Sequence, residues 1–119
     1  MRNDKENVIV NMTFRFAIEI VQIAEELESK RKFVLGNQLL RSGTSIGAMV
    51  REAQNAESKA DFIHKLKIAA KECDETVYWL ELCKEAYSLE RCTVLINRAN
   101  EIMLVLSKII ATTKKSLRV

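Results

Sequence analysis

The residues best placed for acid–base chemistry in this sequence are a close pair of glutamates, Glu72 and Glu75. Residues three apart in a helix lie on one face, so these carboxylates can share a proton or a metal ion. Arg41, Arg51 and Glu52, on the preceding predicted helix, support a second interpretation, in which arginine–glutamate pairs hold two packed helices in register. A di-iron bundle needs Glu-x-x-His motifs, and the chain has none. We therefore favour the structural interpretation and expect no catalytic residue and no metal ligand.

The other nucleophilic and metal-binding side chains are one histidine and three cysteines. The sequence places no nucleophile beside His64, so a surface or half-buried histidine is favoured over a general base. Cys73, Cys83 and Cys92 include no CxxC pair and, with a single histidine, do not complete a usual zinc site. We expect Cys73 and Cys83 to be small core residues, Cys92 to be more exposed, and the protein to be reduced, cytoplasmic and without a cofactor.

The stretch SGTSIG, residues 42–47, has the composition of a phosphate-binding loop. A Walker loop requires GxxxxGK[ST] after a strand, whereas Gly43 and Gly47 are only four apart and no lysine follows them. In a helix, these two glycines share one face beside Ser42 and Ser45, and a neighbouring backbone can approach closely. We therefore predict a close-packing helix seam.

The composition favours long helices. The 119 residues include no proline and three glycines, whereas loop-rich and all-β folds need turn residues about every ten positions. A hydrophobic content of 48% with 29% charged residues is typical of a globular chain and excludes intrinsic disorder. No apolar run approaches the roughly 20 residues that span a bilayer, and the N-terminus is not a signal peptide, so we expect no membrane contact.

Hydrophobic periodicity predicts four helices. Asn11 or Thr13 is the expected N-cap of the first helix, Ser58 with Asp61 caps the third, and Ser88 is the candidate for the fourth. Short connections make neighbouring helices antiparallel, so the predicted fold is all-α, an antiparallel up-and-down four-helix bundle. The predicted helices cover residues 12–32, 36–55, 58–86 and 89–113 of a single domain, 1–119, with a polar leader, 1–10, and a basic tail, 114–119.

The expected core faces of the last two helices follow from their spacing. The third helix has apolar and small residues in a four–three alternation that is typical of a bundle seam: Phe62, Leu66, Ala69, Cys73, Thr76, Leu80, Cys83 and Tyr87. The corresponding face of the fourth helix is Leu95, Ala99, Ile102, Leu106 and Ile109.

The first helix has more apolar surface than one core requires. One stripe is Phe14, Ala17, Ile18, Val21 and Ala24, and a second stripe beside it is Phe16, Ile20, Ile23 and Leu27. We predict that the second stripe contacts another subunit, together with Tyr78 and Trp79 of the third helix, because Trp and Tyr are enriched at interfaces. Stacking of the two aromatic rings on nucleic-acid bases is the alternative.

Positive charge is concentrated at the C-terminal end of a chain whose net charge is +3. Residues 88–119 have two acidic side chains and six basic ones: Arg91, Arg98, Lys108, Lys114, Lys115 and Arg118. Basic residues near a helix C-terminus also complement the helix dipole, which gives a purely structural explanation. Repeated around an oligomeric ring, however, these residues would form a positive belt able to contact phosphates.

The central block, Gln38 to Ala86, resembles a known bacterial family, the four-helix-bundle proteins encoded by intervening sequences in 23S rRNA genes. The motifs that match are RSGTSIG (Arg41–Gly47), REA (Arg51–Ala53), Ser58 with Asp61-Phe62, Lys71-Glu72, and Glu75-Thr76 with Tyr78-Trp79-Leu80. The resemblance implies a structural role for Arg41, Ser42, Gly43, Ser45, Gly47, Arg51, Glu52, Glu72 and Glu75. It also implies a homo-oligomer, since members often form rings of five, and a related branch comprises basic accessory proteins of diversity-generating retroelements that bind a reverse transcriptase and nucleic acid.

The predicted function is that of a non-enzymatic homo-oligomeric bundle that binds RNA, DNA or a nucleic-acid-handling protein through its basic fourth helix. The alternative is a structural oligomer or protein–protein adaptor without a nucleic-acid role.

Overall fold

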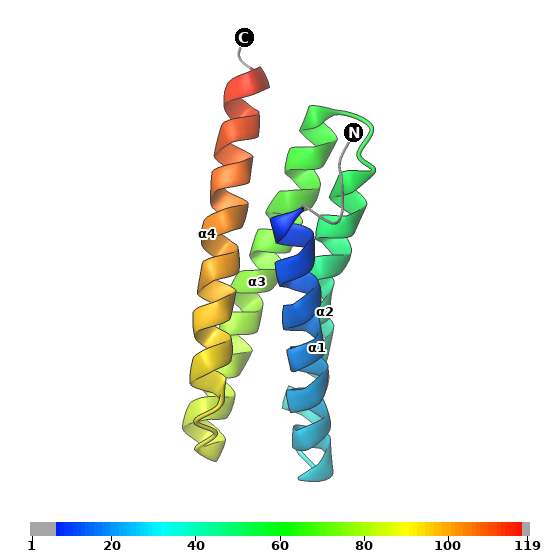
Figure 1. Cartoon of the computed structure of the whole chain (residues 1–119). Coiled ribbons are helices and arrows are strands. Elements are labelled where there is room, and N and C mark those ends of the chain that lie inside the picture. Colours follow the sequence, from blue (N-terminus) through cyan, green and yellow to red (C-terminus); the bar gives the residue numbers. More distant parts are fainter. Residues whose placement is uncertain (1–6, 118–119) are drawn as a thin grey trace.

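Helix-forming residues uninterrupted by proline give the chain four long helices. The structure is a computed structural model that describes residues 7–117. These residues form α1 (Val8–Ser29), α2 (Phe33–Gln54), α3 (Lys59–Tyr87) and α4 (Cys92–Leu117), as Figure 1 shows. The connections between the helices are too short to cross the bundle, so consecutive helices run antiparallel. The predicted all-α up-and-down four-helix bundle is confirmed.

Helix α1 begins earlier than predicted. Asn7 is its N-cap, and the Asn7 side chain accepts a hydrogen bond of 3.3 Å from the Val10 backbone N–H. Asn11 and Thr13, the predicted caps, lie inside the helix. The reason is the apolar run that follows Asn7, because Ile9 and Val10 are buried in the bundle. Residues 8–10 therefore belong to the helix and not to a polar leader.

The turn between α1 and α2 closes with a Schellman motif. The Lys32 N–H donates to the Leu27 carbonyl and the Arg31 N–H donates to the Glu28 carbonyl, each at 2.8 Å. Arg31 has a φ of 63°, in the left-handed region that usually holds glycine at this position. Because the motif ends α1 at Ser29 and leaves only three linking residues, α2 starts at Phe33, before the predicted Gly36.

The caps of α3 follow its sequence signals in part. The Ser58 hydroxyl accepts a hydrogen bond of 3.0 Å from the Asp61 N–H, as predicted, and the Asp61 carboxylate accepts one from the Glu57 N–H. Ser88, predicted as the N-cap of the fourth helix, instead ends α3 in a left-handed conformation with a φ of 55°. Helix α4 then begins at Cys92 and continues to Leu117, so residues 114–117 of the predicted tail are helical.

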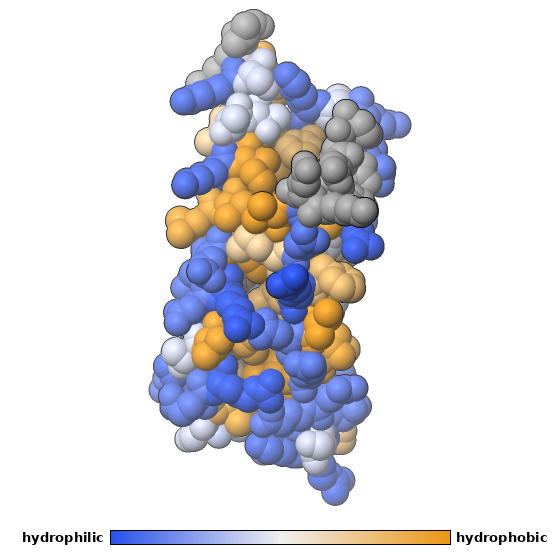
Figure 2. All heavy atoms as spheres, in the orientation of Figure 1, coloured by the Kyte–Doolittle hydropathy of each residue, from blue (hydrophilic) through white to orange (hydrophobic). Residues whose placement is uncertain are grey.

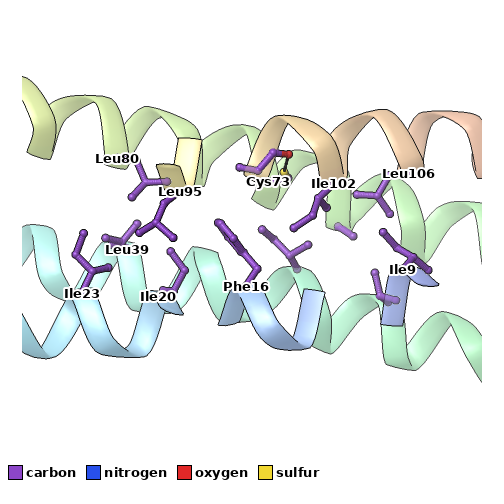
Figure 3. Packing of buried hydrophobic residues seen from close by; sticks show 14 of the residues in the cluster. Ile9, Phe16, Ile20, Ile23, Leu39, Cys73, Leu80, Leu95, Ile102 and Leu106 are labelled. Atoms are coloured by element: carbon purple, nitrogen blue, oxygen red, sulfur yellow. Dashed lines mark hydrogen bonds between the residues drawn. The ribbon is translucent and has the colours of Figure 1, made fainter. Parts of the chain in front are cut away.

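The predicted seams of α3 and α4 form the core. On α3, the residues from Leu66 to Cys83 in the four–three alternation are all buried, with Phe62 and Tyr87 partly buried at its ends. On α4, the face from Leu95 to Leu106 is buried and Ile109 is partly buried. Figure 3 shows these side chains meeting Phe16, Ile20 and Ile23 of α1 and Leu39 of α2.

The four helices are not packed equally tightly. Each helix packs along its neighbour in the chain, whereas α1 and α4, which close the bundle, contact each other much less. In Figure 1, α4 stands apart from α1 and extends beyond it at the C-terminal end. Figure 2 shows apolar side chains on the upper part of α4, between charged ones. No helix within residues 7–117 is long and apolar enough to cross a membrane.

Candidate functional site

The SGTSIG stretch is helical throughout and packs tightly against α1. A Cβ added to Gly43 would lie 2.7 Å from both Cγ1 and Cγ2 of Ile20, and one added to Gly47 would lie 3.3 Å from the Thr13 carbonyl oxygen. Neither glycine has a positive φ, so close packing and not backbone conformation requires them. The predicted close-packing seam is confirmed, and the contact is with α1.

On the other side of α2, the same stretch forms a buried hydroxyl contact with α3. The Thr76 Oγ lies 3.0 Å from the Ser42 Oγ and 2.7 Å from the Glu72 carbonyl oxygen. Both side chains are fully buried, and the shared hydrogen bonds satisfy them there. The Ser45 hydroxyl donates back to the Arg41 carbonyl at 2.6 Å within α2. Ser42 therefore specifies the α2–α3 contact, and Gly43 the contact with α1.

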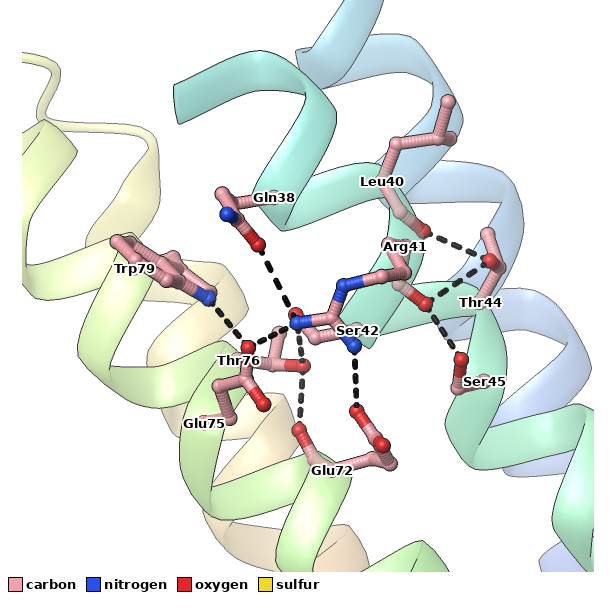
Figure 4. A network of polar contacts seen from close by, with 10 residues as sticks. All are labelled: Gln38, Leu40, Arg41, Ser42, Thr44, Ser45, Glu72, Glu75, Thr76 and Trp79. Atoms are coloured by element: carbon pink, nitrogen blue, oxygen red, sulfur yellow. Dashed lines mark hydrogen bonds and ion pairs between the residues drawn. The ribbon is translucent and has the colours of Figure 1, made fainter. Parts of the chain in front are cut away.

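A polar cluster lies just outside this hydroxyl pair (Figure 4). The Arg41 guanidinium of α2 forms ion pairs with Glu72, at 3.4 Å, and with Glu75, and donates to the Gln38 side chain at 3.3 Å. The Trp79 indole N–H donates to Glu75 at 2.9 Å. Arg41 lies between the two carboxylates and Trp79 donates to one of them, so both have partners within the protein, which matches the structural interpretation of this pair.

Arg51 and Glu52 do not join this cluster. The Arg51 guanidinium lies over the Phe14 ring of α1, 5.4 Å from its centroid, and Glu52 forms an ion pair of 3.2 Å with Lys65 of α3. Three of the five charged motif residues therefore act together, and the other two make separate contacts from α2 to its two neighbours.

The prediction of which apolar stripe of α1 contacts another subunit was wrong. Phe16, Ile20, Ile23 and Leu27, which were predicted to contact another subunit, are at most 2% exposed and form the core of this chain. The exposed stripe is the other one: Phe14, Ile18 and Val21 are 53%, 45% and 39% exposed. Both stripes are apolar, and the sequence of α1 does not show how its neighbours pack; the stripe left exposed borders α2, away from the side that faces α4. Of the predicted aromatic interface pair, Tyr78 is exposed and Trp79 is partly buried, with the rings in edge contact.

The exposed stripe borders a surface groove between α1 and α2, here called the α1/α2 groove. Two adjoining hollows form it, one lined by Phe14, Ala17, Thr44, Gly47 and Ala48, the other by Val21, Phe33, Gly36 and Leu40. The first hollow is mostly apolar and includes Gly47 of the close-packing seam, whereas Asn37 adds a polar side chain to the second. Arg51 lies at one end of the groove, and Glu25 and Glu28 lie at the other.

Residues 5–108 match the family model described as 23S rRNA-intervening sequence protein. The chain belongs to this family. A solved structure of a protein with unknown function from the S23 ribosomal protein family, from Bacteroides thetaiotaomicron VPI-5482, is 45% identical to it. The match covers 87% of this chain and 98% of that one, with a TM-score of 0.83. No curated protein matches the chain.

In this member of the 23S rRNA-intervening sequence protein family, two of the predicted phosphate-binding residues are already engaged. Arg91 forms an ion pair with Glu26 and Arg98 forms one with Glu19, so both arginines fasten α4 to α1 across the weakest contact in the bundle. Both arginine side chains are 48% exposed, so their assignment as nucleic-acid ligands stays a prediction. Lys108 and Lys115 are exposed, Lys114 is partly buried, and Arg118 lies outside the described residues.

The cysteines of this family member are buried, including Cys92, which was predicted to be more exposed. Cys92 is the first residue of α4, and its side chain points into the core as the helix begins. Burial raises the pKa of Cys73 to about 11, with a smaller contribution from Asp74, and raises the pKa of Cys92 to about 11. His64 is exposed. Between residues 7 and 117, no group of three His, Cys, Asp or Glu side chains is arranged to hold a metal ion.

Proposed function

We propose that this protein is a non-enzymatic homo-oligomeric bundle whose copies associate through the α1/α2 groove, and that it binds nucleic acid, or a protein that handles nucleic acid, through the C-terminal half of α4. The observation that carries the proposal is the groove itself. Phe14, Ile18 and Val21 stand beside it with 39–53% of their surface exposed, a larger apolar area than isolated surface residues present.

The shape and charge of the groove support a protein partner. Small residues in α2, such as Gly47 and Ala48, let a neighbouring helix approach closely. The basic end at Arg51 and the acidic end at Glu25 and Glu28 give a surface with opposite charges at its two ends, which would orient an incoming chain. Because the surface has one basic and one acidic end, it complements the same surface on a second molecule, and we infer that the partner is another copy.

The test of self-association is an Ile18→Arg variant measured by size-exclusion chromatography with light scattering. We expect the wild type to elute as an oligomer and the variant as a monomer, because a charge is buried unpaired in the interface. Leu104→Arg is the matched control, since Leu104 is 66% exposed on α4, away from the groove. A monomeric wild type, or equal effects of the two variants, would contradict the proposal.

The nucleic-acid component is supported by the free basic residues on α4. Lys108 and Lys115 are exposed and form no ion pair within residues 7–117, in contrast to Arg91 and Arg98. Titration of the protein against a labelled RNA and a DNA duplex at several salt concentrations tests it. Binding whose log affinity falls with log salt supports phosphate contacts.

A structural oligomer or adaptor without a nucleic-acid role is the second candidate. The engagement of Arg91 and Arg98 with α1 favours it, because these residues are explained by bundle stability alone. An oligomer that binds neither nucleic acid even at low salt would select this candidate.

A further inference from the structure

The basic residues of the bundle divide into two groups by their contacts. Those that form ion pairs, such as Arg41, Lys65 and Arg98, have their charges compensated by glutamates. On α3 and α4, a second group is exposed and forms neither an ion pair nor a side-chain hydrogen bond within residues 7–117: Lys59, Lys67, Lys71, Lys108 and Lys115. A phosphate therefore displaces no internal partner when it binds to this second group.

The antiparallel packing of α3 and α4 brings this second group together. The first half of α3, residues 59–73, lies along the last half of α4, residues 105–117. These two segments contain seven basic and two acidic side chains, whereas the other halves, 74–87 and 92–104, contain two basic and five acidic ones. The fold thus concentrates positive charge at one end of the α3–α4 pair and negative charge at the other.

Four of the exposed lysines also lie on outward ridges of the two helices, and Lys59 is the first residue of α3. Lys67 and Lys71 are four residues apart on α3, on the side opposite the buried Leu66, Ala69 and Cys73. Lys108 and Lys115 are seven apart on α4, again opposite its buried face. Packed helices lie about 8–10 Å apart, so one phosphate backbone can contact both ridges.

We propose that these five residues, the α3/α4 lysine surface, form the nucleic-acid contact surface of this protein, with α3 supplying as much of it as α4. The inference rests on the proposed nucleic-acid role and deepens it. Lysine binds phosphate as a point charge and reads no base edge, so the contact is independent of sequence and accepts RNA and DNA backbones alike. Lys59 and Lys71 are about 18 Å apart along α3, which accommodates several consecutive phosphates.

The experiment compares three double variants of the full chain by fluorescence anisotropy with a labelled single-stranded RNA and a DNA duplex. Lys67→Gln/Lys71→Gln removes two charges from α3, and Lys108→Gln/Lys115→Gln removes two from α4. Lys32→Gln/Lys84→Gln is the control, because it makes the same charge change at the opposite end of α3. Circular dichroism verifies that all three remain folded.

We expect the α3 and α4 variants each to weaken binding at least about fivefold and to lower the salt slope by about two, and the control to change neither appreciably. Weakening by the α4 variant alone would overturn the role of α3 while leaving the proposed function standing. Equal weakening by the control would show that only net charge matters and would overturn the surface. No binding by the wild type to either nucleic acid, or binding to anionic lipid vesicles only, would overturn the proposed nucleic-acid role together with this inference.

Discussion

At Gly43 the packing of α2 on α1 depends on a single missing methyl group. Alanine in the middle of a helix is favoured over glycine by about 1 kcal/mol, so an alanine here would improve the helix itself. The space, however, is occupied by the branched side chain of Ile20, which is fully buried and has no room to move away. Packing and helix propensity therefore oppose each other at this position. Because the added Cβ would lie only 2.7 Å from Ile20, the cost in packing outweighs the gain in helix propensity.

We predict that Gly43→Ala lowers the free energy of unfolding by about 1–3 kcal/mol, measured by urea denaturation, since overpacking a buried site strains its neighbours. Gly36→Ala is the control, because its nearest contacts at 3.4 and 3.5 Å are ordinary, and it should gain up to about 1 kcal/mol. The double variant Gly43→Ala/Ile20→Ala should lose less unfolding free energy than the sum of the two single losses. Removing the Ile20 side chain makes room for the methyl group that is added at Gly43. A stabilising Gly43→Ala change would contradict the close contact.

Arg31 presents the opposite situation, a side chain where glycine is preferred. Its φ of 63° and the Schellman hydrogen bonds around it place it at the usual glycine position after a helix. We predict that Arg31→Gly raises the unfolding free energy by about 1 kcal/mol, measured by thermal denaturation. Lys30→Gly, one residue earlier and with a negative φ, should not stabilise the protein. Equal changes in both variants would argue against the left-handed turn.

At the scale of the helices, the sequence predicted the features that follow from a repeating apolar pattern. It missed the features that depend on how a neighbouring helix packs. The seam of α3 was found because its four–three alternation holds over about seven turns, from Phe62 to Tyr87. Which stripe of α1 is buried depended on how the neighbouring helices pack around it, about which α1 contains no information. The start of α1 was missed because Val8–Val10 follow a charged segment, and the burial of Ile9 and Val10 depends on the facing ends of α2 and α4.

The buried cysteines make the α3–α4 pair sensitive to alkaline pH. Because the pKa of Cys73 and Cys92 is about 11 in the folded protein and close to 9.0 when unfolded, the unfolded state releases these protons first as pH rises. Stability is fully present below about pH 9 and is lost as the pH rises through about 11, by up to about 2–3 kcal/mol per thiol.

The measurement is the urea midpoint between about pH 8 and about pH 10.5. A Cys73→Ala/Cys92→Ala variant retains the lysine and tyrosine titrations and should lose a smaller part of its stability over this range than the wild type. Parallel pH profiles for the two proteins would show that the thiols are not buried in the folded state.

At the scale of the whole molecule, the two candidate binding surfaces differ in the kind of interaction that each can form with a partner. The α1/α2 groove is apolar, whereas the α3/α4 lysine surface acts through exposed charge. In a ring of copies whose axis runs along the bundles, the lysine surfaces would all lie at the same end. The sequence concealed this arrangement, because Lys59, Lys67 and Lys71 are balanced by acidic residues within α3 and gather with those of α4 only through the antiparallel fold.

This difference predicts opposite responses to salt. Raising the salt concentration to about 1 M should release bound nucleic acid, since salt screens the contacts with phosphate. The oligomer should persist, because salt does not screen the burial of apolar surface. Light scattering and anisotropy on the same samples would report both. Dissociation of the oligomer in parallel with loss of nucleic acid would indicate that charge, and not the groove, holds the copies together.

The end of α4 has a kinetic consequence. Its last buried residue is Leu106, so the eleven residues that follow depend on their own hydrogen bonds and on partial contacts for their helical structure. Such a segment opens at a small free energy, independently of global unfolding. Its amide protons should exchange with solvent long before those of α3, and phosphate bound at Lys108 and Lys115 should slow that exchange and lengthen the lifetime of the helix.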